Sequence, residues 1–95
     1  MPDDLTIDSF SGRVGERFGL DDDGASHDLE LVECERLGQA ALDRVPFSIV
    51  FLGPRDPVLP QRIYSLAHDE LGELEVFLVP IAQGADGTRY EAIFT

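Results

Sequence analysis

The sequence predicts an all-β fold: a small antiparallel meander of about six strands that forms a barrel or two-layer sandwich, with a short N-terminal turn or helix. Three observations favour this class. Apolar residues fall in short runs, turn residues cut the runs at nearly regular intervals, and apolar side chains alternate within most runs. A chain of 95 residues has room for one core. Residues 1–95 should therefore form a single β domain, with residues 1–15 as an N-terminal capping segment.

The N-terminal third has the least regular pattern. Mixed spacing of apolar residues indicates a capping turn or short helix, and then a strand that begins near Glu16; these residues are Leu5, Phe10, Val14 and Phe18. Residues 21–24 read Asp-Asp-Asp-Gly, a hairpin loop in which the glycine supplies a positive φ. In the next strand, 28–36, the alternation breaks. A β-bulge near Leu31 would bring four residues to one side: Leu29, Leu31, Val32 and Cys34.

The remaining strands are clearer. Residues 37–44 are a loop or a single helical turn, and residues 45–52 form the clearest core strand, in which Val45 begins the alternation. Further strands are expected over 62–67, with Tyr64 and Leu66 inward, and over 74–81 and 88–94. Connections are short, so neighbours in sequence should pair as a meander. The predicted core residues are Phe47, Ile49, Phe51, Leu74, Val76, Leu78, Tyr90 and Phe94.

Two of these strands are apolar on both faces, which a lone barrel does not require. The outward residues are Val50, Leu52, Phe77, Val79 and Ile81. Contiguous apolar surface of this kind usually marks an interface. A second copy of the chain, giving a homodimer, is slightly favoured as the cover. The alternative is that the N-terminal segment carrying Phe10, Val14 and Phe18 folds back over the same face and leaves a monomer.

Charge narrows the classes of partner. Asp and Glu number 19 against 7 Lys and Arg, so the formal net charge is −12. This charge repels nucleic-acid phosphates and anionic lipids, which leaves a protein partner or the chain itself. The sequence holds neither a signal-peptide pattern nor an apolar run of bilayer length, so a soluble, cytoplasmic protein is expected.

Catalytic patterns are weak, and the sequence predicts no catalytic, cofactor-binding or metal-binding residues. His27 and His68 lie far apart at turn edges, and the single cysteine, Cys34, lies between glutamates that would raise its pKa. Ser26-His27 are neighbours in sequence rather than a placed dyad. The carboxylate pairs Glu33/Glu35 and Glu73/Glu75 are expected on solvated strand faces. Residues Asp21, Asp22 and Asp23 fail the EF-hand spacing, although a weak surface cation site stays open.

Several segments together resemble a bacterial family of short, single-domain proteins of unknown function. They read Phe51-Leu-Gly-Pro, Pro57-Val-Leu-Pro-Gln-Arg-Ile-Tyr64, Leu71-Gly-Glu-Leu-Glu-Val-Phe-Leu-Val-Pro-Ile81 and Tyr90-Glu-Ala-Ile-Phe94. Phe10, Val14-Gly-Glu16 and Phe18 fit the opening of that family as well, so the resemblance covers nearly the whole chain. It carries no assigned catalytic residues. Such proteins are often encoded near tail-collar, tail-fibre-like proteins, which implies a structural or adhesive partner.

The function expected from the sequence is therefore a non-catalytic interaction or structural module, an accessory to a larger bacterial, tail-fibre-like assembly. A small-molecule or carbohydrate-binding barrel that uses its mouth is the alternative. An enzyme of unknown type is the third possibility.

Overall fold

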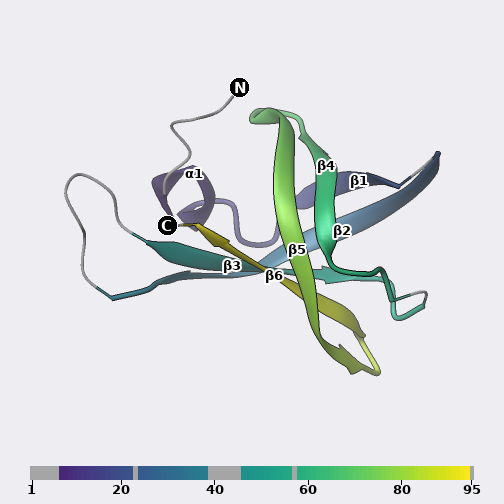
Figure 1. Cartoon of the computed structure of the whole chain (residues 1–95). Helices are drawn as coiled ribbons and strands as arrows, with labels where there is room; N and C mark the ends of the chain where they lie inside the picture. Colours follow the sequence, from purple (N-terminus) through teal and green to yellow (C-terminus); the bar gives the residue numbers. More distant parts are fainter. Residues whose placement is uncertain (1–6, 23, 39–45, 57, 95) are drawn as a thin grey trace.

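Six antiparallel strands close into a barrel in the computed structural model of the chain, which describes residues 7–22, 24–38, 46–56 and 58–94 (Figure 1). The elements are α1 (Ile7–Ser11), β1 (Arg17–Asp22), β2 (Ala25–Arg36), β3 (Phe47–Gly53), β4 (Arg62–His68), β5 (Gly72–Gly84) and β6 (Gly87–Phe94). The predicted fold class is confirmed. Closure pairs every strand on both sides and so removes the free sheet edges that would invite aggregation.

The strand order departs from the predicted meander. Around the barrel it is β1-β2-β3-β6-β5-β4, so β3 pairs with β6 and β4 pairs with β1. The connection between β3 and β4, residues 54–61, contains three prolines and joins two strands that are not neighbours. This connection instead passes across one end of the barrel.

Inward side chains of all six strands fill the barrel. Seven of the eight predicted core residues are buried: Phe47, Ile49, Phe51, Leu74, Val76, Leu78 and Tyr90. The eighth, Phe94, is only partly buried because it lies at the end of β6, where it stacks on Phe47 with ring centroids 4.8 Å apart. Tyr64 and Leu66 point inward as expected.

The predicted bulge in β2 is present, with one difference. The β2–β3 register shifts between Leu31 and Glu33, which makes Val32 the extra residue. Leu29 and Leu31 lie in the core and Cys34 packs against it, whereas Val32 is half-buried outside the core. The extra residue shifts the phase of the alternation, so that Leu31 and Cys34, three residues apart, both face the core while Val32 does not enter it.

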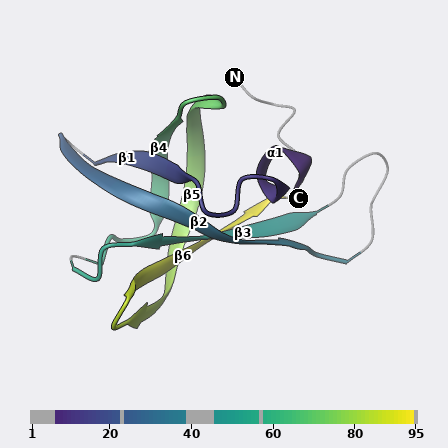
Figure 2. The same cartoon turned by 180° about the vertical axis from the view of Figure 1, so that it is seen from behind.

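The N-terminal segment closes one end of the barrel. Phe10 of α1 is fully buried, and its ring centroid lies 5.7 Å from that of Phe94, 5.9 Å from Phe47 and 6.4 Å from Phe18. Figures 1 and 2 show α1 beside the C-terminal end of β6, away from the β1–β2 and β5–β6 hairpins. The predicted short helix is therefore present, and Phe10 plugs the barrel.

The β3–β4 connection closes the opposite end. Leu59 is buried there, and its backbone N–H donates a hydrogen bond of 2.9 Å to the Tyr90 hydroxyl inside the barrel. Tyr64 in turn donates to the Pro60 carbonyl at 2.5 Å. A buried hydroxyl needs such partners, because an unpaired one costs free energy. Both ends of the barrel are thus occupied by the chain's own residues.

Strand limits agree with the sequence pattern to within a few residues. The first strand begins at Arg17, one residue after the predicted start, and β5 is longer than expected at both ends. Gly24 has the positive φ, 88°, that the hairpin requires. Several predictions, on Leu5, on Asp23, on Val45 and on the loop or helical turn near 37–44, lie wholly or mostly outside the described residues.

Candidate functional site

An exposed apolar surface lies on the outer face of β4 and β5. Ile63 and Phe77 stand directly opposite each other in the β4–β5 ladder, and they are 64% and 50% exposed. Val79 follows on the same face of β5, and Ile81, the extra residue of a second bulge, is 49% exposed. We call these four residues the β4–β5 face. Burying a side chain of this size is worth about 1.5–3 kcal/mol, so its exposure needs a reason.

Three of these four residues, Phe77, Val79 and Ile81, belong to the interface predicted from the sequence. The other two residues of that predicted interface belong to a different strand. Val50 and Leu52 lie on β3, where the ladders pair them with Glu91 and Arg89 of β6. Val50 is only 6% exposed and Leu52 is half-buried. The expectation that Val50 stands in water is therefore wrong, because neighbouring strands of the curved barrel already enclose it. Ile63 was missed, since its partner becomes evident only from the strand register.

From Ile7 onward, where the structure describes it, the N-terminal segment does not cover the β4–β5 face. Phe10 and Phe18 enter the barrel core instead, and Val14 is itself 52% exposed. The intramolecular cover considered from the sequence is therefore wrong. The reason is geometric: Gly15 and Glu16 exchange backbone hydrogen bonds with Leu31 of β2, which holds the segment at the barrel end.

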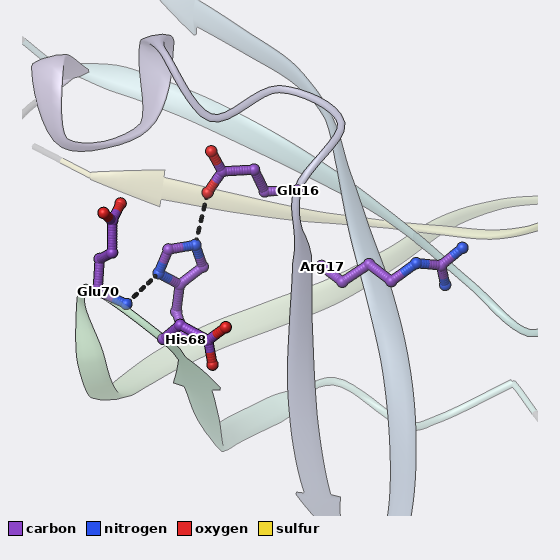
Figure 3. A pocket seen from close by; sticks show the side chains of 5 residues that line it. Glu16, Arg17, His68 and Glu70 are labelled. Atoms are coloured by element: carbon purple, nitrogen blue, oxygen red, sulfur yellow. Dashed lines mark hydrogen bonds and ion pairs between the residues drawn. The ribbon is translucent and has the colours of Figure 1, made fainter.

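A second candidate is a hollow of about 500 Å³ at the end of β4, lined by Glu16, Arg17, His68, Asp69 and Glu70. The His68 side chain is 5% exposed and its ring packs on Phe18, with centroids 4.6 Å apart. Figure 3 shows Glu16 and the Glu70 backbone meeting opposite sides of the imidazole, while Arg17 points away from it. The hollow is thus polar and surrounds a histidine that other groups hold in place.

Both ring nitrogens of His68 are engaged. Nδ1 accepts backbone N–H groups from Glu70 at 3.0 Å and Leu71 at 3.1 Å, which requires an unprotonated Nδ1. Nε2 then carries the proton and donates it to Glu16 at 2.6 Å. A general base needs a lone pair that faces the substrate. In this arrangement neither nitrogen offers one, so the histidine fastens the β4–β5 turn to the N-terminal segment.

An arginine strengthens the same junction. Arg13 forms an ion pair with Glu70 on the β4–β5 turn, lies 3.5 Å from Glu16, and donates to the Ser9 carbonyl at 3.1 Å. The hydrogen bond from Arg13 holds the pKa of the Glu70 carboxyl below its ordinary value. The network therefore joins α1, the linker and the turn.

The other sequence candidates are dispersed in the structure. Cys34 is partly buried, donates weakly to the Ile7 carbonyl, and has a thiol pKa raised by desolvation, which disfavours the thiolate. Asp22 pairs with Arg62 across β1 and β4, whereas Asp21 is exposed. Within the described ranges, no group of three or more His, Cys, Asp or Glu side chains is placed to hold a metal ion.

The architecture defines a class: a small closed antiparallel barrel with both ends filled and an apolar outer face. The chain belongs to the family described as a domain of unknown function, DUF6916, whose model matches residues 5–94. This match confirms the resemblance to a family of short, single-domain proteins of unknown function. No curated protein and no solved structure matches the chain. None of the described helices is long and apolar enough to cross a membrane.

Proposed function

We propose that the protein is a non-catalytic interaction module that binds another polypeptide chain through the β4–β5 face. The observation that carries the proposal is the exposed Ile63–Phe77 pair, whose two residues face each other in the β4–β5 ladder. Because the pair stays exposed, it contributes little burial free energy to folding. A partner that covered it would gain that free energy on binding. Aromatic and large apolar residues in this position are typical of interface centres.

The filled barrel favours this function over the alternative of a ligand-binding barrel mouth. Phe10 occupies one end and Leu59 the other, and inward side chains pack the space between them. A small-molecule site is usually a concave pocket with free polar groups. The hollow beside His68 is concave, but its histidine is already engaged on both nitrogens. The outer face therefore has the stronger support.

The family resemblance supplies a setting for such a module. An accessory to a larger tail-fibre-like assembly would need a stable core that resists unfolding and one surface that recognises a neighbour. A homodimer would cover the same face, since a second copy presents the same apolar residues. Both occupants make the β4–β5 face the functional surface.

Photo-crosslinking tests this proposal. Phe77 is replaced by benzoyl-phenylalanine, which keeps the aromatic ring, and the variant is expressed in the cells from which the gene comes. The matched control carries the same group at Val14, which is equally exposed but lies on the N-terminal linker. We expect a discrete protein adduct from position 77 and little from position 14. Equal adducts from both positions, or none from position 77, would refute the proposal.

A further inference from the structure

Carboxylates border the β4–β5 face. Glu73 and Glu75 are exposed on the same side of β5 as Phe77, four and two residues before it. Glu91 of β6 pairs with Val79 in the β5–β6 ladder. In the part of the chain that the structure describes, none of these three carboxylates forms an ion pair. The apolar pair therefore lies within a local field of uncompensated negative charge.

The arginines nearest to the face are already paired within the chain. Arg62, which precedes Ile63, forms an ion pair with Asp22 and lies over the ring of Tyr64, with its guanidinium carbon 5.1 Å from the ring centroid. Arg89 lies 3.4 Å from an oxygen of Asp86. A partner must therefore bring its own positive charge if the bordering carboxylates are to be neutralised.

We propose that the occupant of the β4–β5 face is a segment of another polypeptide that carries large apolar side chains next to lysine or arginine. This inference rests on the proposed function and names the class of partner. A second copy of the chain is disfavoured, because a two-fold contact would bring together two chains that each carry a net charge of −12 and the same unpaired carboxylates around this face. A cationic partner would instead be attracted by the same carboxylates.

The geometry of β5 sets the spacing within that segment. Residues two apart on a strand are separated by about 6.6 Å, so Glu75 lies about 7 Å and Glu73 about 13 Å from Phe77 along the strand. An extended partner that places an apolar residue over Phe77 and Ile63 would therefore carry its cations two and four positions away. The Ser65 and Ala67 side chains opposite these glutamates are small, which leaves room for long cationic side chains.

The test selects partners without assuming one. A phage library of random 12-residue peptides is panned against the purified full-length chain, and enriched peptides are measured by titration against three double variants. Ile63→Thr/Phe77→Thr replaces the apolar pair with two β-branched residues that remain compatible with a strand. Glu73→Gln/Glu75→Gln removes the bordering charge. Glu33→Gln/Glu35→Gln is the matched control, an identically spaced exposed pair on β2, on the opposite side of the barrel.

We expect enriched peptides that combine large apolar residues with Lys or Arg two to four positions away. Their affinity should fall by more than about tenfold in Ile63→Thr/Phe77→Thr, because interface anchors carry most of the binding energy. It should fall by about threefold to tenfold in Glu73→Gln/Glu75→Gln and weaken with added salt. The Glu33→Gln/Glu35→Gln control should change it by less than about twofold.

Two results would overturn the inference in different ways. Uncharged peptides at this face, or a dimer in sedimentation equilibrium that Ile63→Thr/Phe77→Thr dissociates, would refute the cationic partner and leave the interaction surface standing. A monomer together with no peptide whose binding depends on Ile63 and Phe77 would refute both the partner and the proposed function.

Discussion

Replacing Phe10 by alanine tests whether α1 is an integral plug of the barrel. Phe10 is fully buried among three aromatic rings whose centroids lie within 6.4 Å. Truncation of a buried phenylalanine costs about 3–5 kcal/mol, and each aromatic pair adds about 0.5–1.5 kcal/mol beyond its buried area. For a domain of this size the total free energy of unfolding is about 5–14 kcal/mol. Phe10→Ala should therefore remove a third or more of it.

Urea unfolding followed by circular dichroism measures this change, and thermal unfolding should show a fall in Tm of about 12 °C or more. The control is Val14→Ala in the same segment, where an exposed side chain should change stability by less than about 0.5 kcal/mol. A five-residue helix is unstable alone, so the segment's order depends on this contact. A Phe10→Ala variant destabilised by less than 1 kcal/mol, or no more than Val14→Ala, would refute the plug.

Three further changes probe the other end of the barrel, the strand packing and the Arg13 network. Tyr90→Phe should destabilise the fold by about 1–3 kcal/mol in urea unfolding, because it leaves the buried Leu59 N–H without its acceptor; an unchanged midpoint would contradict the bond. Gly53→Ala should cost about 1–3 kcal/mol, since a Cβ there would lie 2.6 Å from a leucine methyl, whereas Gly19→Ala, with open space around it, should be neutral or stabilising; equal effects would be inconsistent with this packing. The depressed pKa of Glu70 adds stability above the ordinary carboxyl pKa of about 4.3, and this stability is lost as the pH falls through the folded-state value. The Tm difference between wild type and Glu70→Gln should therefore shrink from pH 7 to pH 3, and a constant difference would argue against the ion pair.

Local patterns were sufficient for the strands and most of the core. Alternation placed Phe47, Ile49 and Phe51 inside, and the broken alternation near Leu31 located a real bulge. Both features depend on residues adjacent in sequence. The strand order does not, because the pairing of β3 with β6 and of β4 with β1 depends on contacts between distant segments. For the same reason the sequence did not show that Leu59 and Phe10 fill the two ends.

The candidate surface could be predicted only in part. Phe77, Val79 and Ile81 were identified because β5 is apolar on both faces. The same argument wrongly predicted that Val50 is exposed, although neighbouring strands enclose it. Ile63 became part of the face only through its register with Phe77. The hydrogen bond between His68 and Glu16 could not be predicted from the sequence either, because the two residues lie 52 positions apart in the chain.

The proposed binding surface of the protein is the outer face of β4 and β5. Hydroxyl-radical footprinting, read by mass spectrometry, compares the oxidation of each side chain inside the native cells with that of the purified protein. If a partner covers this face, Ile63 and Phe77 become protected from oxidation in cells, while Val58, an exposed apolar residue of the β3–β4 connection, is oxidised equally in both settings. Equal oxidation of Ile63 and Phe77 in the two settings, or protection confined to Val58, would contradict this proposal.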